Sequence, residues 1–199
     1  MEAPRDLASL RRDQILAAAM ACFLENGFKK TGLKKIAQQC NMSVGHIYYY
    51  FRNKDEVIEH IITIATMDFL NHLTKTCIGR TISDEALRAN IYKTVDMFID
   101  EDKGRFVMMM VNESFDKPNL RRILQEAGSR IREHMVKLYH PDEKDPKTLR
   151  LLNARMAVLI SMLEGLRLSN FWYPESDVAY IRDAAVDCIF TLVKSWMMD

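Results

Sequence analysis

The chain has 199 residues, of which 48% are hydrophobic and 28% are charged, and its formal net charge is +1. No apolar run approaches the roughly 18 residues needed to span a bilayer, and the segment "MEAPRDLASLRRD" lacks the apolar stretch of a signal peptide. These features argue against a membrane protein and predict a globular protein of the cytoplasm, with one large domain or a small domain and a larger one.

The spacing of cysteines and histidines argues against metal chemistry. No C-x-x-C pair occurs, so we expect reduced, buried thiols at Cys22, Cys40, Cys77 and Cys188. The five histidines do not stand at metal-ligand spacings with cysteines or acids. The chain also lacks a G-x-S-x-G elbow, a phosphate-binding glycine loop and an H-E-x-x-H motif. We therefore expect no metal, no cofactor and no catalytic residues, and an enzyme would need a site that these patterns do not reveal.

The charge is unevenly distributed along the chain. Six basic residues and no acidic ones lie between Asn26 and Lys54, so this segment carries +6 and the remainder of the chain −5. Such a local excess is typical of a surface that binds a polyanion. A basic face that is merely solvated is the alternative, since lysines also cluster on surfaces without binding anything.

Apolar residues recur at three- and four-residue steps almost throughout the chain, which predicts an all-α fold. The first helix is predicted from about Leu7 to Asn26, with Gly27 as its stop residue. Its apolar stripe consists of Leu16, Met20, Phe23 and Leu24. A second, short helix is predicted next, with Thr31 as its N-cap. Its apolar face consists of Leu33, Ile36, Ala37 and Cys40.

A third short helix is predicted after "CNMS", with Ser43 as its cap and an end near Tyr50 or Phe51. Two short helices joined by a tight turn resemble a helix-turn-helix. At about 100° per residue, one arc of the third helix consists of Val44, Ile47, Tyr48 and Phe51. The opposite side consists of Gly45, His46, Tyr49 and Tyr50.

These two arcs predict different roles. We expect Ile47 and Phe51 to be buried in the core, and Tyr48, at the border, either to pack on the protein or to face outward. The opposite face is expected to contact DNA, because the second helix of a helix-turn-helix enters the major groove. The residues expected to bind phosphate around it are Lys34, Lys35, Arg52 and Lys54.

The stretch "GFKKTGLKKIAQQCNMSVGHIYYYFRNKDEV" resembles the amino-terminal domain of the tetracycline-repressor (TetR) family of bacterial transcription regulators. The resemblance covers about residues 9–60. It rests on Gly27, Phe28, Thr31, Ile36, Ala37, Ser43, Gly45, Ile47, Tyr48, Tyr50, Phe51, Lys54, Asp55 and Val57. It implies an all-helical homodimer of about nine helices. A three-helix DNA-binding domain would occupy residues 1–55, and an effector-binding and dimerisation domain residues 56–199.

Carried over by position, the resemblance also implies the residues that touch DNA. They are Thr31, Ser43, Val44, Gly45, Tyr48, Tyr49 and Lys54. Gly32, Val44 and His46 depart from the residues that are common at these positions in the family. The base preference of a relative therefore cannot be transferred to this chain.

Beyond Asp55 the periodicity alone predicts the remaining helices. Their expected ranges are Val57 to about Cys77, Asp84–Asp100, Lys103–Ser114, Pro118–Leu138, Lys147–Trp172 and Ser176–Met198, with a polar loop at 140–146. Two of them contain the runs "FVMMMV" and "SMLEGLRLSNFWYP", which suit a mainly apolar pocket, although methionine stripes more often only fill a core.

The residues expected to line such a pocket are Met97, Phe106, Met108, Met110, Glu113, Glu164, Arg167 and Trp172. An acid that reaches the pocket would favour a cationic ligand, and Arg167 would favour an anion. The three charged side chains could equally be exposed or paired across a dimer interface.

Two functions fit these patterns. The first is a repressor that binds a palindromic double-stranded operator as a dimer and is released by a small, mainly apolar effector. The dimer would form through the last two helices, whose apolar residues include Leu159, Met162, Leu166, Ile189, Leu192, Val193 and Trp196. The second is a helical DNA-binding module that is constitutive or controlled by a protein partner.

Overall fold

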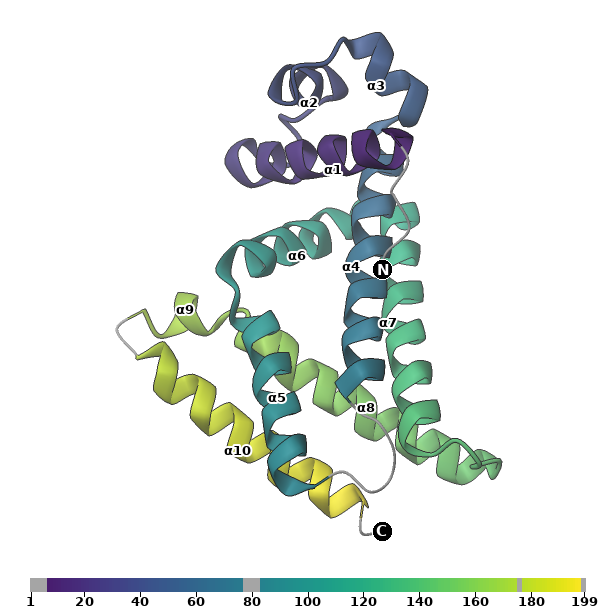
Figure 1. Cartoon of the computed structure of the whole chain (residues 1–199), viewed down its shortest axis with the longest axis vertical. Coiled ribbons are helices and arrows are strands. Elements are labelled where there is room, and N and C mark those ends of the chain that lie inside the picture. The colour runs from purple at the N-terminus through teal and green to yellow at the C-terminus, as the bar shows by residue number, and fades with distance from the viewer. Residues whose placement is uncertain (1–6, 77–82, 175–176, 198–199) are drawn as a thin grey trace. The chain divides into compact units, whose positions relative to one another are not determined.

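The computed structural model describes residues 7–76, 83–174 and 177–197. These residues form ten helices and no strands, which confirms the predicted all-α fold (Figure 1). The helices are α1 (Leu7–Asn26), α2 (Leu33–Gln39), α3 (Val44–Tyr50), α4 (Lys54–Thr76), α5 (Asp84–Ile99), α6 (Glu101–Ser114), α7 (Pro118–Tyr139), α8 (Pro146–Leu166), α9 (Ser169–Trp172) and α10 (Val178–Met197). The expected helix ends at Cys77, Ser176 and Met198 lie outside the described residues.

The stretch predicted as one helix from Lys147 to Trp172 is interrupted, so this prediction was wrong. α8 ends at Leu166, and α9 is a separate helix of four residues. The Ser169 hydroxyl donates to the carbonyl oxygen of Leu166 at 2.7 Å, so it satisfies an acceptor that the end of α8 leaves open. The apolar periodicity continues through this turn, and it therefore contained no sign of the break.

The chain packs as two compact units. The first comprises the residues up to Thr66 together with Phe106–Ala127, and the second comprises Met67–Arg105 and the residues from Gly128 onward. The domain boundary expected at residue 55 marks the end of the helix-turn-helix and stays a prediction.

The core of the first unit joins α1, α2 and α3 to parts of α6 and α7. The rings of Phe23 and Phe28 stack with their centroids 5.6 Å apart, and the ring of Phe106 lies 6.3 Å from that of Phe23. Met110 of α6 is buried in the same cluster, as are Leu120 and Ile123 of α7. The second half of α6 therefore belongs to the same hydrophobic core as the three amino-terminal helices.

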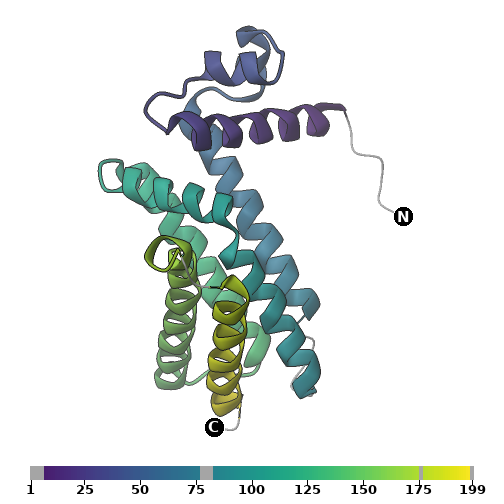
Figure 2. The same cartoon turned by 90° about the vertical axis from the view of Figure 1, so that its left-hand side faces the viewer.

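The core of the second unit forms around α5, which packs against both α8 and α10. Figure 2 shows α8 and α10 lying side by side. Leu159, Ile189 and Val193, which were expected to form a dimer interface, are buried within this unit itself. Leu166 and Trp196 are partly buried against the same core, while Met162 remains exposed.

The cysteines differ in their surroundings. Cys22 and Cys40 are buried as predicted, and burial raises the pKa of both thiols. Cys188 is exposed on α10, which contradicts the prediction that it is buried, because it lies on the outer face of that helix. Cys77 lies outside the described residues. No described helix is both long and apolar enough to cross a bilayer.

Candidate nucleic-acid interface

A tight turn joins α2 to α3. Asn41 adopts a φ of 53°, a left-handed conformation that asparagine tolerates better than most residues. The amide of Met42 donates to the carbonyl oxygen of Ala37 at 2.9 Å and ends α2. The Ser43 hydroxyl oxygen then accepts from the amide of His46 at 3.1 Å, which confirms the predicted cap of α3. The two short helices and their turn form the expected helix-turn-helix.

Thr31 does not cap α2, so that prediction was wrong. The N-cap is Gly32, which has no side chain to accept from the first amides of the helix. The Thr31 side chain is instead buried, and its hydroxyl points at the carbonyl oxygens of Cys22 and Gly27, at 3.0 and 2.9 Å. This hydroxyl ties the end of α1 to the following turn, so the geometry gives Thr31 a structural part. A contact from Thr31 to DNA stays a prediction.

The two faces of α3 are divided as the helical wheel predicts. Ile47 and Phe51 are fully buried in the core, which confirms their expected place. Tyr49 is 79% exposed and Tyr48 is 56% exposed. Tyr48, at the border of the two arcs, therefore faces outward and does not pack on the protein. His46 is exposed beside them. The row of aromatic residues is therefore mostly surface.

The exposed rings are held in place by one another. The ring of Tyr50 lies 5.4 Å from that of His46 and 5.0 Å from that of Tyr49, the second pair at nearly a right angle. Tyr50 is itself half-buried against the core. Because an anchored ring contacts both, His46 and Tyr49 lose little further freedom when they contact a partner.

Gly45 opens the surface between these side chains. A Cβ atom at this position would have only the Ser43 hydroxyl oxygen near it, at 4.0 Å, so packing does not require a glycine. Glycine within a helix costs about 1 kcal/mol relative to alanine. The missing side chain therefore leaves the backbone at the start of α3 accessible to a close partner.

The basic residues surround this face but are not equally free. Lys34 and Arg52 are exposed, and Arg52 also pairs with Glu56 at 3.6 Å. Lys35 is half-buried and donates to the side-chain oxygen of Asn26. Lys34 and Arg52 are therefore the members of the predicted phosphate-binding set that are most available to a polyanion.

Lys54 is engaged inside the protein. Its ammonium donates to the carbonyl oxygen of Phe28 at 2.7 Å and lies 3.9 Å from the centroid of the Phe28 ring. The ammonium of Lys117, at the turn before α7, lies 3.7 Å from the same centroid and pairs with the buried Glu113 at 3.8 Å. Burial lowers the pKa of Lys54, and the charge of Lys117 lowers it further.

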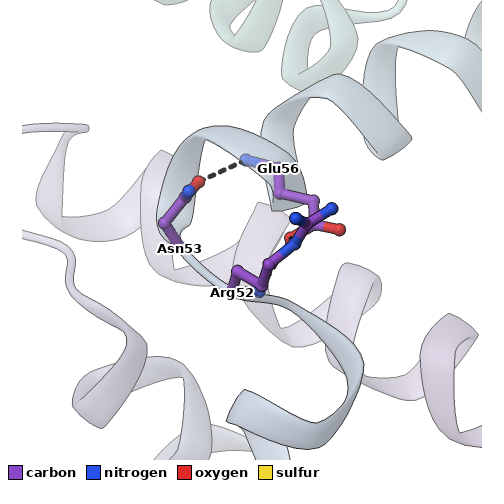
Figure 3. A network of polar contacts seen from close by, with 3 residues as sticks. All are labelled: Arg52, Asn53 and Glu56. Atoms are coloured by element: carbon purple, nitrogen blue, oxygen red, sulfur yellow. Dashed lines mark hydrogen bonds and ion pairs between the residues drawn. The ribbon is translucent and has the colours of Figure 1, made fainter.

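The start of α4 is fixed by a capping network (Figure 3). The side-chain oxygen of Asn53 accepts from the amide of Glu56 at 2.8 Å, and the Glu56 carboxylate accepts from the amide of Arg52 at 2.7 Å. These bonds explain why α4 begins at Lys54 rather than at Val57. Sequence reasoning missed both residues, although "NKDE" has the spacing of a capping box.

The residues expected to line an effector pocket are distributed over both packing units. Phe106 and Met110 are buried in the core of the first unit, and Met108 is exposed. Met97 packs against the core of the second unit. Trp172 is 64% exposed, because α9 carries it outward with Phe171. These side chains do not converge within either unit.

The three charged candidates are all paired. Glu113 is buried and pairs with Lys117, as described above. Glu164 accepts from Nε of Arg167 at 2.6 Å, and the guanidinium of Arg167 lies over the ring of Phe98 with its central carbon 4.3 Å from the centroid. The structure therefore brings Glu164 and Arg167 together within the second unit.

A helix-turn-helix with an exposed polar and aromatic face, flanked by lysine and arginine, defines a DNA-binding protein of the transcription-regulator class. Residues 15–61 match the family described as "Bacterial regulatory proteins, tetR family". This segment therefore matches the DNA-binding domain of the TetR family, as its resemblance implied.

Comparison with known proteins extends this likeness beyond the helix-turn-helix. The transcriptional regulator BetI from Burkholderia mallei is 25% identical over 169 residues, which are 81% of this chain and 82% of BetI. The structure of GusR from Salmonella enterica superposes with a TM-score of 0.73 at 22% identity, covering 95% of this chain and 98% of GusR. A complex of SmeT with triclosan superposes with a TM-score of 0.69 at 22% identity, covering 90% and 89% of the two chains.

Proposed function

We propose that this protein is a repressor that binds a palindromic operator as a homodimer and is released by a small, mainly apolar effector. The observation that carries the proposal is the outward face of α3, where Gly45, His46 and Tyr49 lie exposed on a helix whose opposite side is buried. This face is held by a capped helix-turn-helix, so it is rigid enough to read a groove.

In this proposal α3 enters the major groove with its amino-terminal end. Ser43 and Gly45 lie at that end, so backbone and hydroxyl groups would meet phosphate while His46 and Tyr49 reach base edges. Lys34 and Arg52 would contact phosphates on either side. A repressor of this kind acts because its bound dimer occupies the operator.

The dimer would form through the outer faces of α8 and α10. Leu151, Val158 and Met162 are exposed on α8 at spacings of seven and four residues, which places them on one face. The exposed residues of α10 include Tyr180, Ala184 and Cys188, at four-residue spacing. Small side chains allow close approach of helices, so the two faces suit a four-helix interface between two copies.

The effector would bind in the second unit. The complex of SmeT with triclosan supports a small-molecule ligand for a protein of this fold. The dispersal of the predicted pocket residues over two units favours the second candidate, a DNA-binding module without small-molecule control. The two functions differ in whether any small molecule releases the protein from DNA.

The test begins with selection of duplex DNA from a random-sequence library by the purified protein. The proposal expects an enriched inverted repeat that is bound as a dimer, with affinity that falls steeply as salt rises. Binding without sequence preference, or selection of a single half-site by a monomer, would refute it. A small-molecule screen for release of the selected DNA then separates the repressor from the uncontrolled module.

A further inference from the structure

Resting on the proposed function, we propose that Arg167 is the anion-recognition residue of the effector site and that the effector carries a single carboxylate on an apolar body. The site is formed within the second packing unit, at the end of α8, by Arg167 with Phe98 and Glu164 around it.

The guanidinium of Arg167 is almost completely withdrawn from solvent. Its side chain is only 11% exposed, its central carbon lies 4.3 Å from the centroid of the Phe98 ring, and Nε donates to the Glu164 carboxylate at 2.6 Å. The backbone of Arg167 also runs close to α6, since a Cβ at Gly104 would lie 3.4 Å from its carbonyl oxygen. These contacts fix the position of the guanidinium.

One end of this guanidinium has no partner. Nη1 of Arg167 is buried and makes no hydrogen bond with any described residue. A guanidinium stays protonated at any physiological pH, so all of its N–H groups remain hydrogen-bond donors that need acceptors. Buried donors in folded proteins are nearly always satisfied, so an orphan here indicates an acceptor that comes from outside the chain.

The neighbouring carboxylates do not supply that acceptor. Asp100 caps α6 by accepting from the amide of Lys103 at 3.0 Å, and it pairs with the ammonium of Lys103 at 3.3 Å. Glu164 is bound to Nε and not to Nη1. Arg182 also has a buried nitrogen without a hydrogen bond, but that Nε lies 2.7 Å from the carboxylate of Asp96, so its charge is matched directly.

The surroundings indicate the charge and the polarity of the ligand. Because Glu164 pairs with the guanidinium and the Asp100 carboxylate also interacts with its charge, a dianion such as a phosphate would be repelled more strongly than a monoanion. A carboxylate accepts from guanidinium N–H groups in a favourable planar geometry. The ring of Phe98 and the partly buried Met97 belong to the apolar core beside the site, which favours a ligand with an apolar body.

The chain offers a matched control for Arg167. Arg88 also lies over a ring, 4.2 Å from the centroid of Phe190, and pairs with Asp187 at 2.5 Å. Its side chain is 48% exposed, and none of its nitrogens is a buried orphan. Arg88 therefore reproduces the charge, the ring and the acid partner of Arg167 without the buried, unsatisfied donor.

The experiment measures binding of octanoate, 4-phenylbutyrate and naphthalene-2-carboxylate by calorimetry. The primary amide and the corresponding amine of each probe serve as neutral and cationic counterparts. We expect a carboxylate to bind more tightly than both counterparts, and Arg167→Met to weaken this binding about 10- to 100-fold. Arg88→Met should change the carboxylate affinity less than about twofold. Arg167→Lys keeps the charge but not the planar pair of N–H donors, so its affinity should lie between those of the native protein and Arg167→Met.

The inference is overturned if no carboxylate binds, if amides or amines bind as well, or if Arg167→Met retains the affinity. Melting temperatures of the three variants show whether each is folded. If Arg167→Met does not fold, the affinity of Arg167→Lys is used in its place. Release of the selected DNA is measured in parallel. Carboxylate binding without any specific DNA binding would refute the proposed function alone, whereas specific DNA binding without carboxylate recognition would refute only the inference.

Discussion

The ammonium of Lys54 donates to the carbonyl oxygen of Phe28, 26 residues earlier in the chain, and lies over the ring of the same residue. Lys54 begins α4, the helix that follows α3, while Phe28 lies in the turn between α1 and α2. One lysine therefore connects both sides of the helix-turn-helix. The charge of Lys54 therefore contributes to the stability of the first unit.

Replacing Lys54 by methionine should destabilise the first unit. The variant loses a hydrogen bond from a charged donor and a cation–π contact, which together contribute about 1–3 kcal/mol. The midpoint of urea unfolding should fall accordingly, and affinity for all DNA sequences should weaken alike because the helix-turn-helix loosens. Lys34→Met, at an exposed position, is the control and should leave the unfolding midpoint unchanged. Equal midpoints for Lys54→Met and the native protein would contradict this role.

His46 and Tyr49 should determine base preference. Each ring is exposed and braced by Tyr50, so replacement by alanine removes base contacts without disturbing the core. We expect losses of about 1–3 kcal/mol at particular base pairs of the operator, and little change at others. Competition binding with single-base operator variants measures this pattern.

Lys34 provides the contrasting case for sequence preference. Its removal should weaken binding to every sequence by a similar factor and reduce the slope of log affinity against log salt by about one. If His46→Ala and Tyr49→Ala also weaken all sequences uniformly, these two residues do not read bases.

The helix-turn-helix could be predicted from the sequence because its signals are local. The burial of Ile47 and Phe51 follows from helical periodicity, and the cap at Ser43 follows from the preference of serine for that position. Thr31 has the same cap preference, but its hydroxyl is used by the carbonyl oxygens of Cys22 in α1 and Gly27 in the following turn, and this arrangement depends on how the two helices pack. Lys54 is a similar case, since its partner Phe28 is distant in sequence.

The candidate effector residues were harder to predict for a different reason. A methionine or an aromatic residue within an apolar run has the same pattern whether it fills a core, as Met110 does, or lies on the surface, as Trp172 does. Which of these happens depends on tertiary packing. The turn before Trp172 is formed by backbone hydrogen bonds and by the Ser169 hydroxyl, within an otherwise periodic stretch.

The stability of the second unit should fall at mildly acidic pH through His72. Burial and, to a lesser degree, the charge of Lys93 hold the pKa of His72 below its usual 6.5. The Nε2 atom of His72 lies 3.1 Å from the hydroxyl oxygen of Thr94. Because the Thr94 hydroxyl donates its own proton to the backbone carbonyl oxygen of Asn90, the neutral His72 ring can donate from Nε2 to the Thr94 oxygen.

The sign of this effect follows from the lowered pKa. The unfolded chain binds a proton at His72 more readily than the folded chain, so the free energy of unfolding decreases as pH falls below about 6.5. His72→Gln, which keeps a donor toward Thr94 but does not titrate, should show a smaller loss of melting temperature between pH 7.5 and pH 5.5. An identical loss in both proteins would exclude His72 as the cause.

Val158 should be essential for dimer formation if α8 and α10 form the interface. It is 53% exposed in the single chain, and a glutamate there would place a charge in an apolar contact between two copies. We expect Val158→Glu to sediment as a monomer at micromolar concentration and to bind the operator much more weakly. Phe115→Glu, at an exposed position on the first unit, is the control and should remain a dimer. A dimeric Val158→Glu protein would place the interface elsewhere.

In the proposed complex, two copies of α3 read the major groove of one palindromic site. Methylation of guanine N7, an atom that faces the major groove, tests this most directly on the selected operator DNA. Methylation should block binding at two clusters of guanines whose centres lie about one helical turn, roughly 34 Å, or somewhat more apart. His46→Ala and Tyr49→Ala should weaken this interference within both clusters. Interference at a single cluster, or none at any guanine N7 within an operator that the protein binds specifically, would contradict it.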